Sequence, residues 1–214
     1  MQDNANKPDR RQARTKQLLY EALMDLVREK GAENVTVTDI ASRANINRGT
    51  FYLHYRDVPD MLQQLKDDVF SRIRAKVEKL DIKEAWAYAD RDEAYPQGVI
   101  VFDELAKHAD FLRTMVGAQG DMSYALRFRE LFTAHIYEKV KYAPEGKSIM
   151  PPDYFVAYVT SANFGFLMHW IESGMNLTSE EMARIMIRLM HYGPLVSLGL
   201  KEVPPGGAKI AEER

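Results

Sequence analysis

The segment TVTDIASRANINRGTFYLHYRD, residues 36–57, constrains the fold more than any other part of this 214-residue chain. Thr36 followed by Asp39 forms a capping box, in which each side chain bonds a free N–H group at the start of a helix. Asn47 can cap a second helix a few residues later. Between them lies Asn45, and Asn is the residue other than Gly that best tolerates a left-handed turn. The segment therefore predicts two short helices joined by a tight turn.

Further helices are expected on both sides of this segment. Before it, apolar residues recur with helical spacing from Leu18 to Val27, and Gly31 is expected to end that helix. After it, Asp57 and Asp60 repeat the capping pattern and predict another helix. Three helices in about fifty residues, with a tight turn between two of them, form a helix-turn-helix arrangement. An ordinary helical hairpin within a bundle would give the same pattern.

The rest of the chain is expected to stay helical, because no convincing alternating strand pattern is found. The stretch DIKEAWAYADRDEAYPQG, which contains Pro96 and Gly98, is predicted to be a broken segment. Helices are predicted over residues 100–108, 110–116, 123–141, 153–173 and 178–192. The predicted fold class is all-α, with a three-helix helix-turn-helix domain over residues 10–56 and a larger helical domain over residues 57–200.

Composition narrows the possible partners and the compartment. The chain has no Cys, which excludes disulfides and fits a reducing cytoplasm. No apolar run approaches the length of a membrane span, and the start lacks the features of a secretory signal, so we expect a cytoplasmic protein without a membrane partner. Residues 1–56 contain ten Lys and Arg against seven Asp and Glu, which favours a polyanion partner for this part. Arg10, Arg11 and Arg14 are candidates for DNA contacts, with a merely solubilising role as the alternative.

The aromatic residues beside Gly49 sort onto two faces of a helix predicted over residues 48–54. Phe51 and Tyr55 lie four residues apart and are expected to pack inward. Gly49 would let the backbone approach another surface closely. Tyr and His side chains can bond phosphate oxygens, while Arg and Thr can reach base edges in a DNA groove. These properties suit a recognition helix, whereas the solvated surface of a bundle is the alternative. The outward residues would be Arg48, Gly49, Thr50, Tyr52 and His54.

The same residues resemble the N-terminal DNA-binding domain of TetR-family regulators. The shared pattern is a basic first helix, Thr-Val-x-x-Ile-Ala, a short turn, Gly-Thr-Phe-Tyr-x-His-Tyr and a capped fourth helix, over about residues 14–65. The variant with Asp57 is most similar to the branch that contains regulators of dihydroxyacetone kinase genes. Two departures are Asn45, where the family usually has Gly, and Val58, where a Lys commonly contacts phosphate. Arg56 is the candidate replacement for that Lys.

The resemblance implies a homodimer that binds palindromic double-stranded DNA through residues 10–56, with regulation and dimerisation in residues 57–200. The expected DNA-binding residues are Thr36, Thr38, Asn47, Arg48, Gly49, Thr50, Tyr52, His54 and Arg56. It also implies a pocket for an unknown small-molecule effector, although plain core packing uses the same residue types. The candidate pocket residues are Phe111, Met115, Tyr124, Phe128, Tyr158, Phe164 and Trp170.

Two helices near the C-terminus are the predicted dimer interface. The helix over residues 153–173 is apolar on nearly all sides, and such a helix is buried against more than one neighbour. Small residues in it would allow close approach of a second helix: Ser161, Ala162 and Gly165. The next helix has an apolar stripe at helical spacing: Met182, Ile185, Met186, Leu189 and Met190. A purely internal core is the alternative.

No catalytic site, metal site or cofactor is expected. Glu104 with His108, and His169 with Glu172, have helical spacing, but no further ligands follow at a suitable distance. Nucleophile elbows and phosphate-binding glycine loops are missing from the sequence. The expected function is a ligand-responsive transcriptional regulator and not an enzyme. The alternative is a TetR-like helical scaffold that senses a small molecule or binds a partner protein without binding DNA.

Overall fold

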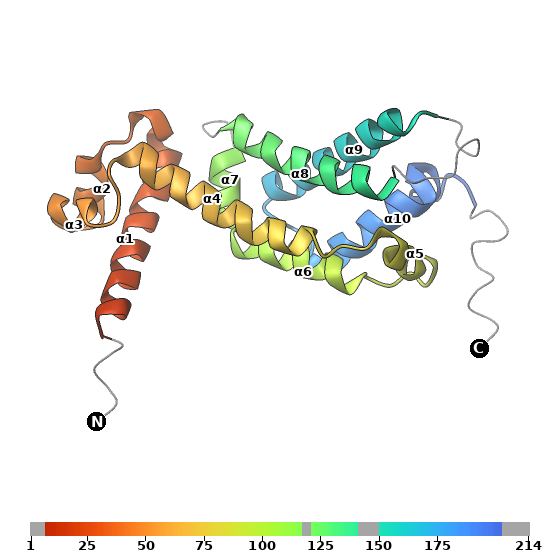
Figure 1. Ribbon diagram of the computed structural model, residues 1–214, viewed down its shortest axis with the longest axis horizontal. Coiled ribbons are helices and arrows are strands. Elements are labelled where there is room, and N and C mark those ends of the chain that lie inside the picture. Colours follow the sequence, from red (N-terminus) through yellow and green to blue (C-terminus); the bar gives the residue numbers. More distant parts are fainter. Residues whose placement is uncertain (1–6, 117–120, 141–149, 203–214) are drawn as a thin grey trace, which may run out of the picture. The chain divides into compact units, whose positions relative to one another are not determined.

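A computed structural model describes residues 7–116, 121–140 and 150–202 (Figure 1). These residues form ten α-helices and one 3-10 helix, with no strand among them, in agreement with the all-α prediction. The elements are α1 (Lys7–Lys30), η1 (Ala32–Asn34), α2 (Val37–Arg43), α3 (Arg48–Tyr52), α4 (Val58–Val77), α5 (Ile82–Asp90), α6 (Pro96–Lys107), α7 (Ala109–Val116), α8 (Met122–Val140), α9 (Pro152–Glu172) and α10 (Ser179–Ser197).

The described residues form two compact units. The first contains the chain up to Val69 together with Asp110–Tyr124, and the second contains Phe70–Ala109 and the chain from Ala125 onward. The predicted domains, residues 10–56 and 57–200, stay a prediction.

Helix α1 is longer than the apolar pattern predicted. The pattern becomes visible near Thr15, whereas the helix begins at Lys7. The residues from Arg10 to Leu18 are exposed apart from Thr15, which is half-buried, so they carry no apolar face that a pattern search can detect. The helix ends where expected: Gly31 has φ 80°, and its N–H donates to the carbonyl of Val27 at 2.9 Å.

The capping residues and the turn between α2 and α3 confirm the local prediction. Thr36 Oγ1 accepts from the N–H of Asp39 at 3.2 Å, and Asp39 Oδ2 accepts from the N–H of Thr36 at 2.9 Å. Asn45 has φ 52°, and Asn47 Oδ1 accepts from the N–H of Gly49 at 2.8 Å. Helix α3 ends at Tyr52, two residues before its predicted end.

The break predicted around Pro96 and Gly98 lies slightly earlier, at residues 91–95 between two helices. The stretch forms α5 and the start of α6, and Pro96 is the first residue of α6. Proline costs little in that place, because the first N–H groups of a helix have no partner within the helix. Asp81 caps α5 through its carboxylate, which accepts from the N–H groups of Lys83 and Glu84.

In the second unit, α10 packs against α6 and α5 (Figure 1). Thr178 and Glu181 form the predicted capping box at the start of α10. Gly193, with φ 75°, and Pro194 kink the same helix where an interruption was predicted. The inward face of α9 is an apolar stripe with buried Val156, Val159, Thr160, Leu167, Trp170 and Ile171.

Candidate nucleic-acid interface and ligand cavity

Helix α3 has the two faces that its sequence predicted. Phe51 and Tyr55 are buried, with their ring centroids 5.7 Å apart. Tyr52 lies on the other face and is 53% exposed. The two inward rings anchor α3 in the first unit, so the outward side chains are held on a fixed helix.

The nine predicted DNA-binding residues all belong to α2, α3 and the connections beside them. Seven are exposed, while Thr50 and His54 are half-buried. Two of the nine already serve the fold, because the side-chain oxygens of Thr36 and Asn47 cap α2 and α3. Gly49 lies beside the Asn47 side chain that caps α3, and a Cβ at this position would lie 3.3 Å from Asn47 Oδ1. Preserving that cap is a structural reason for Gly, in addition to the predicted close approach to another surface.

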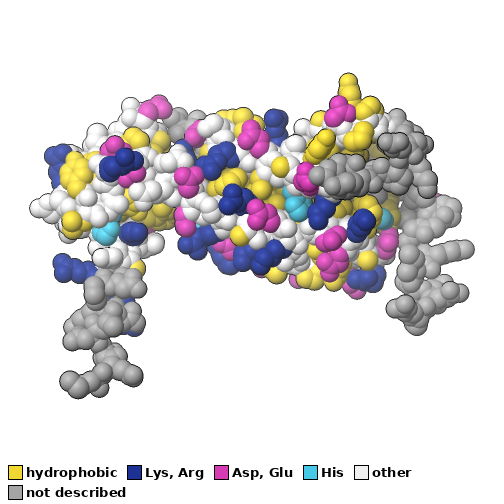
Figure 2. Space-filling model, viewed as in Figure 1, with side chains coloured by type: hydrophobic (Ala, Val, Ile, Leu, Met, Phe, Trp, Pro, Cys, Tyr) yellow, Lys and Arg dark blue, Asp and Glu magenta, His cyan; other side chains and the backbone are white. Residues whose placement is uncertain are grey.

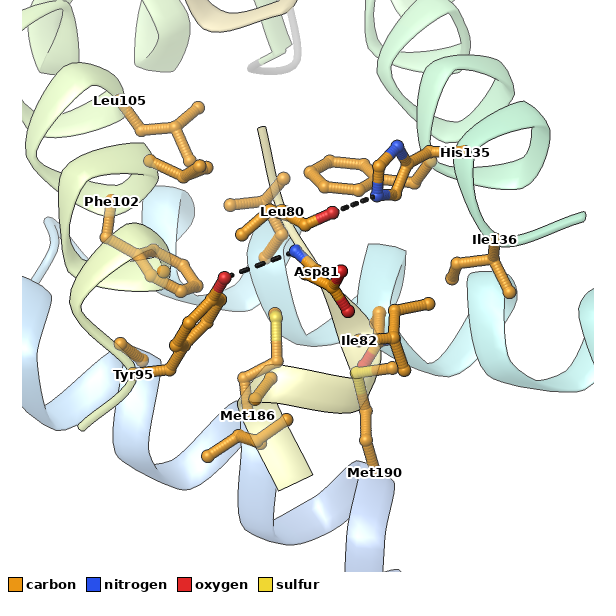
Figure 3. A pocket seen from close by; sticks show the side chains of 18 residues that line it. Leu80, Asp81, Ile82, Tyr95, Phe102, Leu105, His135, Ile136, Met186 and Met190 are labelled. Carbon is orange, nitrogen blue, oxygen red and sulfur yellow. Dashed lines mark hydrogen bonds between the residues drawn. The ribbon is translucent and has the colours of Figure 1, made fainter. Parts of the chain in front are cut away.

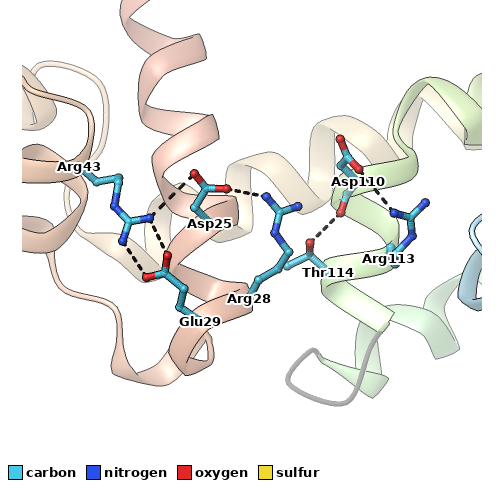
Figure 4. Close-up of polar contacts among 7 residues, drawn as sticks. All are labelled: Asp25, Arg28, Glu29, Arg43, Asp110, Arg113 and Thr114. Atoms are coloured by element: carbon cyan, nitrogen blue, oxygen red, sulfur yellow. Dashed lines mark hydrogen bonds and ion pairs between the residues drawn. The ribbon is translucent and has the colours of Figure 1, made fainter.

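Ion pairs divide the Lys and Arg residues between Arg10 and Arg48 into two groups. Arg28 bonds Asp25 at 2.6 Å and Arg43 bonds Glu29 (Figure 4). Lys30 bonds Asp39 at 2.7 Å. Within the described part of the chain, the structure gives no carboxylate partner to a second group: Arg10, Arg11, Arg14, Lys16 and Arg48. All five side chains are exposed.

The pKa values of two acids follow these contacts. The hydrogen bond from Lys30, together with those from Thr36, holds the pKa of Asp39 well below its usual range. The hydrogen bond from Arg43 lowers the pKa of Glu29. Both acids therefore stay charged at neutral pH and keep Lys30 and Arg43 in place.

The start of α4 differs from the pattern that the resemblance implied. Val58 is buried and its side chain cannot reach a phosphate group outside the protein. Arg56 is 86% exposed at its side chain, and it bonds Asp60 Oδ1 at 3.0 Å. Asp57 caps the N–H of Asp60, but Asp60 accepts from the N–H of Arg56 and does not complete a capping box with Asp57.

The seven predicted pocket residues are divided between the two units. Phe111, Met115 and Tyr124 are buried in the core of the first unit, where the Tyr124 hydroxyl donates to the Lys66 carbonyl at 3.1 Å. In the second unit, Phe128 and Trp170 are buried, Phe164 is half-buried and Tyr158 is 58% exposed.

The second unit contains a cavity of about 100 Å³ that none of those seven residues lines (Figure 3). Its wall is mostly apolar and comes from the α4–α5 connection and from α5, α6, α8, α9 and α10. Four polar residues also line it: Asp81, Tyr95, His135 and Asn163. Sequence patterns missed this site, because its wall is assembled from segments far apart in the chain. The one available signal was Asn163, an amide inside a strongly apolar helix.

Hydrogen bonds occupy the polar groups at one side of the cavity (Figure 3). The Tyr95 hydroxyl accepts from the N–H of Asp81 at 3.2 Å and donates to Glu84 Oε2 at 3.0 Å. His135 Nε2 lies 3.1 Å from the carbonyl oxygen of Leu80. Burial lowers the pKa of His135, which favours a neutral imidazole donating this hydrogen bond.

The two helices predicted to form a dimer interface differ in what they expose. Helix α9 exposes Tyr154, Phe155 and Tyr158, and hydrophobic side chains stand out from the surface over its N-terminal part (Figure 2). The predicted small-residue positions of α9 are also exposed, and nothing lies within 4 Å of a Cβ placed at Gly165. In α10, part of the predicted stripe faces its own subunit: Met182 is buried, and Met186 and Met190 line the cavity.

No group of three or more His, Asp or Glu side chains among the described residues is arranged to hold a metal ion. None of the described helices combines the length and apolar character needed to cross a membrane.

Two family models match the chain. Residues 19–65 match the model for bacterial regulatory proteins of the tetR family. Residues 92–192 match the model described as a transcriptional regulator C-terminal region. The two matches lie in the segments predicted to bind DNA and to form the regulatory domain.

Known relatives agree with these matches. The uncharacterized HTH-type transcriptional regulator YxbF of Bacillus subtilis (strain 168) is 40% identical over 58 residues, which is 27% of this chain and only 15% of that protein. A TetR transcriptional regulator from Streptococcus agalactiae 2603V superimposes with a TM-score of 0.56 at 23% identity, covering 88% of this chain and 99% of that one. NalD of Pseudomonas aeruginosa, a repressor of the MexAB-OprM efflux pump, gives a TM-score of 0.57 at 13% identity, covering 85% and 95%. These two structures support the fold, and the dihydroxyacetone kinase branch stays a prediction.

Proposed function

Because this chain belongs to the TetR family of transcriptional regulators, we propose that it binds operator DNA as a homodimer and that a small molecule modulates the binding. The single observation that carries the DNA-binding part is the division of α3 into two faces. Phe51 and Tyr55 hold the helix from inside, while Arg48 and Tyr52 project outward. A helix held in this way can present its side chains to a DNA groove with little loss of conformational freedom.

The free cations support the same proposal. Arg48 has no acidic partner in the described structure, so its guanidinium is available for the paired acceptors of a guanine edge. Arg10, Arg11, Arg14 and Lys16 extend along the exposed first turns of α1 and suit phosphate contacts, which carry no sequence information. Arg56 is a weaker candidate, because binding phosphate would compete with its bond to Asp60.

The homodimer is supported by the exposed apolar face of α9. Tyr154, Phe155 and Tyr158 are large side chains that the subunit leaves in contact with water. Gly165 and its exposed small neighbours Ser161 and Ala162 leave room for a second helix to approach. A two-fold interface uses the same patch on both subunits, and it would bury this surface. We propose that the half-buried Ile185 and Leu189 of α10 also take part in this interface. Met186 and Met190 of the same stripe do not, because they line the cavity.

The effector part of the proposal is placed at the cavity of the second unit. Two of the helices that line it, α9 and α10, also supply the proposed dimer face, so an occupant that changes their packing would change how two subunits are spaced. The seven aromatic and Met residues predicted as effector contacts do not line this cavity. We therefore propose residues of the cavity wall in their place.

The test is a gel-shift titration of the full chain against DNA fragments that flank its own gene. We expect a shift that weakens as salt increases, because phosphate contacts release counterions. The quadruple change of Arg10, Arg11, Arg14 and Lys16 to Gln should reduce this salt dependence while leaving the preferred fragment unchanged. Binding that is absent for every fragment, with a folded dimeric protein, would contradict the proposal and favour a scaffold without direct DNA binding.

A further inference from the structure

Among the described residues that line the cavity of the second unit, one polar side chain has no hydrogen-bond partner within the protein. Tyr95 and His135 are bonded to Asp81, Glu84 and Leu80 as described above. The Asp81 carboxylate accepts from the first N–H groups of α5. Asn163 is the exception, since the described residues supply no hydrogen-bond partner for its side-chain amide.

The position of Asn163 on α9 makes this exception informative. Residues that precede and follow it at helical spacing are buried: Val156, Val159, Thr160, Leu167, Trp170 and Ile171. Asn163 thus lies on the inward stripe of the helix, where an apolar residue would be expected. The hydroxyl of Thr160, the other polar residue of this stripe, donates to the carbonyl of Val156 at 2.7 Å. Asn163 is half-buried, so its amide has reduced contact with water and would be stabilised by a hydrogen-bonding partner.

The charges at the cavity restrict which partner fits. Among the described residues, no Lys or Arg lines it, and the only ionisable side chains of its wall are Asp81, Tyr95 and His135. Burial disfavours the charged form of His135, and the carboxylate of Asp81 repels anions. A carboxylate or phosphate would therefore be desolvated without a counter-charge.

From these observations we propose that the cavity takes a small, uncharged, mostly apolar ligand whose single polar group, a hydroxyl or carbonyl, bonds the Asn163 amide. This inference rests on the proposed effector role of the cavity and specifies its chemistry. The amide offers two donors and an acceptor oxygen, so it serves either kind of polar group. A volume of about 100 Å³ limits the occupant to about one ring, since a cavity of about 150 Å³ holds benzene.

The test is an NMR titration of the ¹⁵N-labelled full-length protein with four one-ring probes of similar size: phenol, benzene, benzoate and benzylamine. Phenol should shift the side-chain amide signals of Asn163 and bind in the wild type. Asn163→Leu, which replaces the amide oxygen and nitrogen by two methyl groups on the same branched skeleton, should weaken the affinity for phenol by about two- to tenfold, the size of one neutral hydrogen bond. The same variant should leave benzene binding unchanged or tighter. Ser161→Ala, on the exposed side of the same helix, is the control and should affect neither probe.

Three other outcomes would each contradict part of the proposal. Benzoate or benzylamine binding as tightly as phenol would overturn the uncharged ligand class, and this holds even if Asn163→Leu does not fold, because the comparison uses the wild type. Equal weakening of phenol and benzene in Asn163→Leu would overturn the role of the amide. These titrations contain no DNA. Phenol that binds at Asn163 but leaves the gel shift unchanged would contradict the effector proposal while the ligand class stands.

Discussion

The guanidinium group of Arg43 in α2 donates one hydrogen bond to each carboxylate oxygen of Glu29 in α1, at 2.9 and 2.7 Å (Figure 4). This paired geometry is the same one that Arg uses to read a guanine edge, so a partner inside the protein removes Arg43 from the set of base-reading candidates. Arg48, five residues later, has no such partner among the described residues and remains available.

We therefore expect Arg48→Ala to relax the preference for one base in each half-site, at a cost of about 1–3 kcal/mol in binding free energy. Sequence selection from a randomised operator, followed by titration of the selected sites, measures both effects. Arg43→Ala is the matched control: it should lower thermal stability slightly and leave the selected sequence unchanged, because it breaks a contact between α1 and α2. Lower affinity of Arg48→Ala with an unaltered selected sequence would reassign Arg48 to a phosphate contact.

Tyr52→Phe should weaken binding to all DNA sequences about equally, because a phenolic hydroxyl on the outward face can bond a phosphate oxygen but carries no base information in that contact. Affinities for the preferred operator and for unrelated DNA at moderate salt give the comparison. Tyr55→Phe, which changes a buried ring three residues later, is the control and should not alter DNA affinity. An affinity equal to that of the wild type would remove Tyr52 from the interface, and a changed base preference would make it a base contact.

Charge on the exposed face of α9 should separate the two subunits. Tyr158 is 58% exposed in the single subunit, so Tyr158→Glu places its charge in water there and in a buried interface only in the dimer. This design avoids the ambiguity of Ile185→Glu, since Ile185 is half-buried and a charge there can also unfold the subunit. Analytical ultracentrifugation at micromolar concentrations should give a dimer for the wild type and 24.6 kDa for the folded variant, with weaker operator binding.

The control for that experiment is Tyr137→Glu on α8, where a tyrosine of similar exposure lies on another helix. It should remain a dimer and bind the operator normally. A wild-type protein that sediments as a monomer at all concentrations would contradict the proposed interface, and the exposed tyrosines of α9 would need another partner.

Stability should fall when the pH drops through the ordinary pKa of histidine, and His135 should account for part of the loss. Burial lowers the pKa of His135 in the folded protein, so the unfolded chain binds the proton first on acidification. The free energy of unfolding is then highest above about pH 6.5 and decreases below it. The charge of nearby Lys139 also lowers the pKa of His135, while the Leu80 carbonyl, Asp81 and Glu78 raise it.

Urea unfolding of the wild type and of His135→Gln between about pH 5 and about pH 8 measures this contribution. The variant keeps a side-chain donor for the Leu80 carbonyl but cannot be protonated, so its stability should depend less on pH in this range. Equal pH dependence of the two proteins would show that other groups are responsible.

The local features of the fold were predictable because their causes lie within a few residues of one another. The capping boxes at Thr36 and Thr178, the left-handed Asn45 and the opposite orientations of Phe51 and Tyr52 each depend on neighbours within one or two helical turns. The position of the helix break near Pro96 was predicted less well, and the reason is again local. Pro96 was interpreted as a break, although its effect depends on whether it stands in the first turn of a helix or later.

By itself, the sequence determined an all-α chain with capped helices around a tight turn and an outward set of Arg, Thr, Tyr and His side chains. Only the tertiary structure decided which polar groups are already satisfied. Arg43 is bonded, whereas Arg48 has no carboxylate partner among the described residues. Asn163 lines a mostly apolar cavity, and its wall includes Met186 and Met190 from a stripe interpreted as a dimer surface. The reason is physical: whether a side chain has a partner depends on groups that are distant in sequence, and helical periodicity shows which residues share a face but not what that face contacts.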